Sequence, residues 1–536
     1  MMRSPIMRRG ALPGAIAGLI GGLAFGAAMA WLGHLPTIAS IVRSSHAGVG
    51  FLVHMVIAAI VGTGFGLLVR NQRLGGGDML FWGMTYGTLW WFLGPLSLLP
   101  LILGGTVNWN VASAQAAFPS LVGHLWYGAV TAAAYAVLRR REWAVARPTA
   151  AGIALGGVAG LAGAWLFQRL LNGQAPWLIA SGIVTREAHG LNPIVTAVAG
   201  LLAGAGFAVL YPRVRESSGP VLVQGTMYGF ACWVAGALTF APLAAGTGLA
   251  WSVDAARARF PLLLGCLLAG AFLALVYRWV DGVARFLFAD DVGAWDEEGI
   301  GTRGLRALGR GAFAGLIGGL IFTVIMLRVG FLPTVARLVG ASSLRSGLIV
   351  HLVIANLIGA SFGVLFLRRS FDLGSALGWG ISYGFFWWVL GPLTLLPVLL
   401  GAAPRWTPGI AAALMPSLIG HLGYGAGVGV TFYLLEARYN PWWISHTDAE
   451  AARTAERREQ VLTSAPALWA LVVVVALTLP VVLTCVMPSA GTPGRPRGAP
   501  APAGGYVGAS PPPAYGQTQA PADACTQDEP SPRPSY

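Results

Sequence analysis

Four histidines are the side chains within the apolar segments that are best suited to chemistry. His54 and His351 occupy the same place in two copies of one stretch, LVHMVIA and IVHLVIA, which differ only by apolar exchanges. His124 and His421 likewise share the setting Gly-His-Leu. Imidazole suits haem iron, copper and zinc as a ligand, and it also forms hydrogen bonds. Two pairs of histidines therefore predict two equivalent sites.

The element that must position these histidines is a proline-containing apolar segment. The sequence WWFLGPLSLLP at residues 90–100 returns as WWVLGPLTLLP at residues 387–397, and a looser copy, CWVAGALTFAP, covers residues 232–242. Each proline removes a helical hydrogen bond, and a membrane tolerates this only where neighbouring groups satisfy the freed carbonyls. We therefore expect a bent helix that is enclosed by partner helices, with structural roles for Pro95, Pro100, Pro392 and Pro397.

The recurrence extends beyond this segment and indicates three copies of one unit. Each unit contains four apolar stretches of about twenty residues, the length that a bilayer core requires. The fold class predicted is an all-α, polytopic transmembrane protein with about 13 spans, in three parallel four-helix repeats plus one C-terminal span. The three membrane units are expected at residues 1–145, 146–285 and 311–438, with a cytoplasmic linker at 286–310 between the second and the third. A charged cytoplasmic segment at 439–465, a thirteenth span at 466–487 and a disordered tail at 488–536 are expected to follow.

Composition and charge exclude most other classes of protein. Apolar residues make up 56% of the chain and charged residues 10%, which is typical of a multi-pass membrane protein and not of a soluble domain. The net charge of +14 comes from arginines that lie between the apolar stretches, so it predicts no nucleic-acid partner. Their clustering on one side predicts a cytoplasmic N-terminus and an extracytoplasmic C-terminal tail in the cell inner (plasma) membrane.

A short amphipathic segment follows the first span of each unit, beginning at Pro36, Pro176 and Pro333. Proline in a first turn followed by mixed residues predicts an interfacial helix on the outer face. Such a helix either covers a pocket below it or seals the bundle, and we favour sealing. The partners predicted are the lipid bilayer and, for the Pro-rich tail, an extracytoplasmic partner, with an uncommitted tail as the alternative.

The histidines are expected to lie in the outer half of the membrane, roughly 6 to 9 Å deep at about 1.5 Å per residue. Tyr127 and Tyr424 follow the second histidine of each pair by three residues and would share its face. Three interpretations stay open: a haem or metal site, a pathway for a polar solute, or histidines that donate to carbonyls released by Pro95 and Pro100.

Two further features bear on the site. Trp91 and Trp388 could stack on a flat cofactor or simply pack between helices. The middle unit has Thr196 and Cys266 in place of the two histidines, so we expect no equivalent site there.

One unit resembles the small bacterial inner-membrane proteins of the YagU type and related four-helix families. The resemblance is carried by a glycine-rich first helix, a second helix opening near His54, an aromatic and proline-interrupted third helix, and a fourth that begins Gly-His-Leu at His124 and ends in arginines. It implies an inner-membrane location and a loose association with acid tolerance. It implies no particular activity.

Function follows from what the spans contain and lack. No span carries an Asp, Glu or Arg in its middle, which disfavours a carboxylate-based proton or ion antiporter. We predict a non-enzymatic channel-like, carrier-like or scaffold role with paired outer-leaflet histidines and no assigned cofactor. The alternative is a membrane electron-transfer protein that binds haem b or a metal through His54, His124, His351 and His421.

Overall fold

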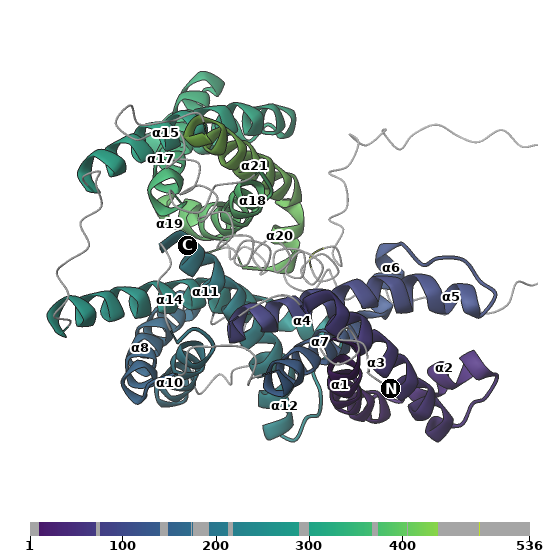
Figure 1. The fold of residues 1–536 in the computed structure, drawn as a ribbon. Coiled ribbons are helices and arrows are strands. Elements are labelled where there is room, and N and C mark those ends of the chain that lie inside the picture. The colour runs from purple at the N-terminus through teal and green to yellow at the C-terminus, as the bar shows by residue number, and fades with distance from the viewer. Residues whose placement is uncertain are drawn as a thin grey trace, which may run out of the picture. The chain divides into compact units, whose positions relative to one another are not determined.

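The computed structural model describes residues 10–70, 75–139, 148–172, 174, 179, 192–212, 218–288, 300–366, 373–404, 406–437 and 482. The described elements are helices, which confirms the all-α class, and Figure 1 shows them in chain order. The charged segment 439–465, the tail and the thirteenth span, except for Val482, lie outside the described residues, as does the amphipathic segment that begins at Pro176.

The first repeat has a long helix, a short helical segment, a second long helix, a third helix in three pieces, another short helix and a fourth long helix. Its elements are α1 (Leu12–Trp31), α2 (Leu35–Ala39), η2 (Ser40–Val42), α3 (Ala47–Val69), α4 (Gly76–Leu93), η3 (Gly94–Leu98), α5 (Leu99–Ile102), α6 (Val111–Ala116) and α7 (Phe118–Leu138).

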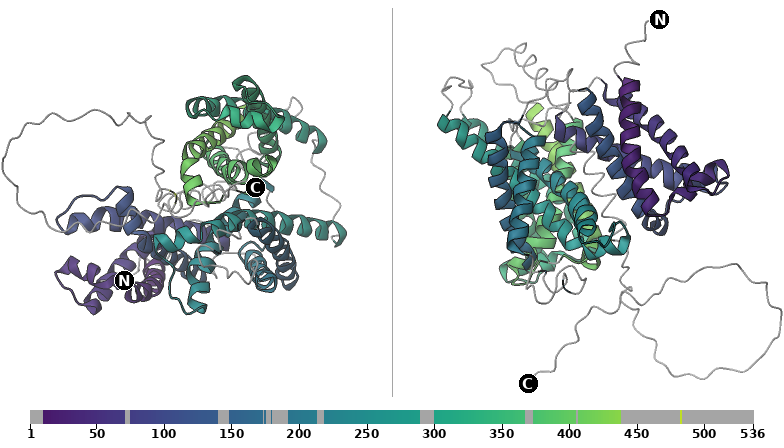
Figure 2. Two further views of the ribbon diagram at one scale, coloured as in Figure 1. Left: turned by 180° about the vertical axis from the view of Figure 1, so that it is seen from behind. Right: turned by 90° about the horizontal axis from the view of Figure 1, so that it is seen from below.

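The same order of elements returns in the third repeat and, apart from the short segment after α8 that lies outside the described residues, in the second. The second comprises α8 (Ala150–Asn172), α10 (Pro193–Leu210), α11 (Ser218–Cys232), η5 (Trp233–Phe240), α12 (Ala241–Ala244), α13 (Val253–Ala258) and α14 (Phe260–Phe288). The third comprises α15 (Ile300–Val329), α16 (Leu332–Ala336), η6 (Arg337–Val339), α17 (Leu344–Phe366), α18 (Leu373–Leu390), η7 (Gly391–Leu395), α19 (Leu396–Leu399), α20 (Pro408–Ala413) and α21 (Met415–Ala437). Figures 1 and 2 show the four long helices of the third repeat side by side.

Eleven helices in the described part of the chain are long and apolar enough to cross a membrane. The segment α4–α5 is not among them, although it holds the same place in its repeat as Ser218–Ala244 and Leu373–Leu399, which are. Large apolar side chains on the outer face of α3, such as Leu52, Val56 and Ile60, are more than 60% exposed, as expected of a surface in contact with lipid.

Glycines set the distance between the first and second long helices of each repeat. A Cβ added at Gly18 would meet the backbone of Ala58 and Gly62, and one added at Gly359 would meet the backbone of Gly311 and Gly315. Close backbone approach through small residues is a common mode of helix packing in membranes. The helix pairs α1 with α3, α8 with α10, and α15 with α17 all use it.

The third helix of each repeat widens to a π-turn, as the interruption by proline and glycine predicts. The first of the two prolines is not essential, because the middle repeat has Ala237 where the first has Pro95. All three repeats instead share a hydroxyl that donates to the carbonyl five residues earlier: Ser97 to Phe92, Thr239 to Val234, and Thr394 to Val389, at 2.7 to 2.8 Å.

The same hydroxyls hold the segment that follows the broken helix. Each accepts a tryptophan indole N–H from twelve residues later, at 3.0 to 3.1 Å, in the pairs Trp109 with Ser97, Trp251 with Thr239, and Trp406 with Thr394. The Leu96 carbonyl, four residues before Pro100, accepts from the Asn108 amide at 2.8 Å. The bond from Asn108 satisfies the carbonyl that Pro100 releases.

The third repeat also has an ion pair between its first and fourth long helices. Arg310 of α15 donates to Glu436 of α21 at 2.6 Å, and the Nε atom of Arg306 lies 3.9 Å from the same carboxylate. α15 begins at Ile300, N-terminal to the boundary expected at residue 311, and these two arginines lie on that extension.

Candidate functional site

A cavity of about 230 Å³ lies inside the third repeat. Its wall is mostly aliphatic and aromatic, with the polar residues His351, His421, Ser417 and Tyr424 among its lining. The long helices α15, α17, α18 and α21 supply most of this wall, and the rest comes from the widened turn η7, the short helix α19 and the segment of α16 and η6 that follows α15. An apolar pocket with a few convergent polar groups is the usual form of a small-molecule site.

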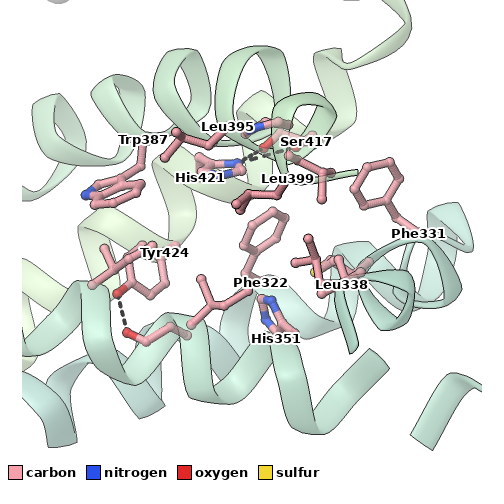
Figure 3. Close-up of a pocket in the computed structure, with 18 residues that line it drawn as sticks. Phe322, Phe331, Leu338, His351, Trp387, Leu395, Leu399, Ser417, His421 and Tyr424 are labelled. Atoms are coloured by element: carbon pink, nitrogen blue, oxygen red, sulfur yellow. Dashed lines mark hydrogen bonds between the residues drawn. The ribbon is translucent and has the colours of Figure 1, made fainter. Parts of the chain in front are cut away.

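The two predicted histidines of the repeat both line this cavity, but they do not face each other directly. Phe322 of α15 stands between them, as Figure 3 shows, with its ring centroid 5.3 Å from that of His351 and 4.7 Å from that of His421. Both contacts are edge-type aromatic packing. The imidazoles are thus brought to one cavity and separated by an apolar ring.

Each imidazole has one nitrogen fixed by a backbone carbonyl. His351 Nε2 lies 3.1 Å from the Gly319 carbonyl on α15, and His421 Nδ1 lies 2.8 Å from the Ser417 carbonyl one turn earlier in its own helix. Ser417 Oγ approaches the same Nδ1 at 3.4 Å. The first bond ties α17 to α15, whereas the second fixes the ring orientation of His421 on α21.

The first repeat reproduces this arrangement. His54 Nε2 lies 3.0 Å from the Gly22 carbonyl, His124 Nδ1 lies 2.7 Å from the Ser120 carbonyl, and the Phe25 ring packs against both imidazoles. The hypothesis that these histidines donate to carbonyls freed by Pro95 and Pro100 is therefore wrong. The Leu96 carbonyl, which Pro100 releases, accepts from the Asn108 amide instead, and the imidazoles bond to carbonyls of ordinary helical turns.

Tyr127 and Tyr424 lie on the face predicted from their spacing, yet their hydroxyls are already engaged. Tyr127 donates to the Ala58 carbonyl at 2.8 Å, and Tyr424 donates to the Ala355 carbonyl at 2.6 Å. Each bond joins the fourth long helix of a repeat to the second. Tyr424 contributes its ring to the cavity wall and its hydroxyl to the fold.

The tryptophans divide into two roles. Trp91 and Trp388 are fully buried and donate to the Ala117 and Leu414 carbonyls, at 3.0 and 3.2 Å, so they pack between helices. Neither of them stacks on the cavity. The neighbouring Trp387 lines it instead, together with Pro392, whereas Pro397 is buried outside the lining.

The short helical segment after α15 covers the cavity. Val335 of α16 and Leu338 of η6 belong to its lining, and Phe331 precedes them. The expectation that this helix forms was right for the first and third repeats, whereas the preference for a purely sealing role was wrong in the third. Leu395 and Leu399 line the cavity and are also exposed, at 37% and 68%, so the wall on their side is the surface that meets lipid.

The middle repeat lacks the imidazoles but keeps the scaffold around them. Thr196 donates to its own helix at Asn192, and Cys266 is a free thiol. Phe167 packs on Gly265 in the way that Phe25 packs on Gly123.

Metal ligation has little support in the described residues, where no three His, Cys, Asp or Glu side chains gather as a metal site would require. The described residues that line the cavity include no acidic side chain. A haem held by both imidazoles of one repeat would need the two rings on opposite faces of one porphyrin, a space that Phe322 occupies.

Sequence reasoning missed Phe322 and Ser417, the two residues that define the surroundings of the imidazoles. A signal for them exists, since Phe25 and Ser120 occupy the same positions in the first repeat. Phenylalanine and serine are common in membrane helices, so recurrence alone did not separate them from ordinary packing residues.

The fold and the apolar cavity define a multi-pass helical membrane protein. Comparisons with protein-family models, curated proteins and solved structures found no match for this chain. The resemblance to YagU-type proteins therefore stays a prediction.

Proposed function

We propose that this chain is a non-enzymatic, carrier-like membrane protein that binds an apolar small molecule in the cavity of its third repeat. The observation that carries the proposal is the cavity itself, with both imidazoles at its wall. At about 230 Å³ it is larger than the roughly 150 Å³ apolar cavities that bind benzene. Its wall next to Leu395 and Leu399 gives the ligand a route from the bilayer.

The arginine distribution supports an orientation in which the N-terminus is cytoplasmic and the cavity lies in the outer half of the inner membrane. His351 and His421 both follow the helix ends that are outer in this orientation. The ligand would then enter from the outer leaflet. The other two repeats would serve as a scaffold, and the YagU-like unit would be the structural module.

A photoreactive apolar probe tests binding directly. The protein in lipid nanodiscs is incubated with an alkyl diazirine, irradiated, digested and analysed by mass spectrometry. We expect labelling of the peptide that contains Leu395 and Leu399. The variant Leu396→Trp places a large ring on the cavity wall and should reduce this labelling, whereas the matched variant Leu99→Trp in the first repeat should not.

Labelling that is unaffected by Leu396→Trp would show that the probe reports the lipid-facing surface and not the cavity, and it would refute the proposal. Transport is tested next with proteoliposomes. Flux of a bound solute that is lost in Leu396→Trp distinguishes a carrier from a scaffold that only binds.

A further inference from the structure

The hydrogen bonds of the two imidazoles determine what each ring offers to a ligand. A carbonyl oxygen can only accept, so the nitrogen facing it must carry the proton. His421 therefore donates from Nδ1 to Ser417, and its Nε2 is left with a lone pair. His351 donates from Nε2 to Gly319, and its Nδ1 is the lone-pair nitrogen.

The surroundings of the cavity keep these rings neutral. The described lining residues include no acidic side chain, and a charged imidazolium would be buried against aliphatic and aromatic groups without compensation. The Tyr424 hydroxyl is already donated to Ala355. The indole nitrogen of Trp387 is on the side of its ring away from His421, as Figure 3 shows. The nitrogen that each imidazole leaves to a ligand is thus a hydrogen-bond acceptor, and the Ser417 hydroxyl is the lining group that can also donate.

The approach to His421 Nε2 is open because Gly391 has no side chain. A Cβ built on Gly391 would lie 3.9 Å from this nitrogen, and Gly391 is itself part of the cavity lining. The widened turn η7 begins at this glycine, so the break in the third helix and the lone-pair nitrogen lie next to each other.

We infer that the cavity selects apolar molecules that carry a hydroxyl group, alcohols or phenols, with His421 Nε2 as the acceptor; this inference rests on the proposed function. A ketone, quinone or ether of the same shape has only hydrogen-bond acceptors, so it cannot bond to the lone pair of this nitrogen. Sites built to bond a substrate hydroxyl discriminate against analogues that lack it. One neutral hydrogen bond is expected to give a roughly two- to tenfold preference.

The test is competition for the labelling described above, using 4-hexylphenol and 4-hexylanisole, in which a methyl group replaces the hydroxyl hydrogen. We expect the phenol to compete at roughly two- to tenfold lower membrane concentration than the ether in the wild-type protein. In His421→Leu the two should compete equally, while labelling itself persists. The matched variant His124→Leu in the first repeat should keep the preference.

A second variant provides an independent test in case His421→Leu does not fold. Gly391→Val leaves the bond from His421 to Ser417 intact and blocks the approach to Nε2, so it too should abolish the preference. Equal competition by phenol and ether in the wild type would overturn the inference and leave the binding proposal standing. Labelling that Leu396→Trp does not reduce would overturn the binding proposal itself.

Discussion

The hydroxyl at the π-turn of the third repeat offers a direct test of how this fold satisfies its polar groups. Thr394 donates to the Val389 carbonyl at 2.8 Å and accepts from the Trp406 indole at 3.1 Å. Thr394→Val keeps the branched shape and removes both bonds. Trp406 is 0% exposed, so its N–H would be left buried without a partner.

The expected cost follows from that burial. A buried donor left unpaired costs about 1–3 kcal/mol, although side-chain bonds between membrane helices are worth about 0.6 kcal/mol on average. We expect a cost in the upper part of this range, because two hydrogen bonds are lost and the buried indole N–H cannot bond to water instead. The equivalent change in the first repeat, Ser97→Ala, should cost less, since Trp109 is 70% exposed and can find another acceptor.

Hydrogen exchange measured by mass spectrometry in nanodiscs is the assay, because it reports local opening. Amides in residues 389–407 should exchange between about five- and about 150-fold faster in Thr394→Val, the range that corresponds to 1–3 kcal/mol. The change for Ser97→Ala in its own repeat should be smaller. If both variants accelerate exchange equally, or if Thr394→Val has no effect, burial of the indole does not set the strength of this bond and the reasoning is wrong.

Three further results are expected. Gly359→Ala adds a methyl group against the α15 backbone and should lower stability by about 1–3 kcal/mol in a thermal unfolding assay, whereas Gly236→Ala, where a Cβ meets nothing within 4 Å, should change little. A double-mutant cycle of Arg310→Gln and Glu436→Gln should give a coupling energy of about 1 kcal/mol; zero coupling would show that the ion pair is not stabilising. Addition of haemin should give no spectrum of a bis-histidine haem, because Phe322 separates the imidazoles; a Soret and α band that vanish in His421→Ala would contradict this.

The sequence was sufficient to predict the helical membrane class and the order of the long helices in each repeat. Recurrence of glycines such as Gly18 and Gly315 located the first helices, and the interruption after Trp91 located the broken third helix. These features are local in the chain, and periodicity and spacing report them directly.

The partners of the histidines could not be predicted in the same way. Spacing showed that His351 and His421 were near equal depth, but their hydrogen bonds depend on the rotation of each helix about its axis. The insertion of Phe322 between them depends on the packing of α15 against two other helices. The prolines suggested the wrong acceptors for the imidazoles, because the carbonyl freed by Pro100 bonds to the Asn108 amide and each imidazole bonds to a carbonyl of an ordinary helical turn.

The middle repeat, which keeps the glycine contacts, the π-turn and the bond between Trp251 and Thr239 without either imidazole, gives the chain an internal reference. Because it is part of the same chain, it is measured in the same membrane and the same sample as the other two repeats. A probe that labels all three repeats equally is only partitioning into the bulk lipid. Labelling that is absent from the middle repeat depends instead on the imidazoles of His54, His124, His351 or His421.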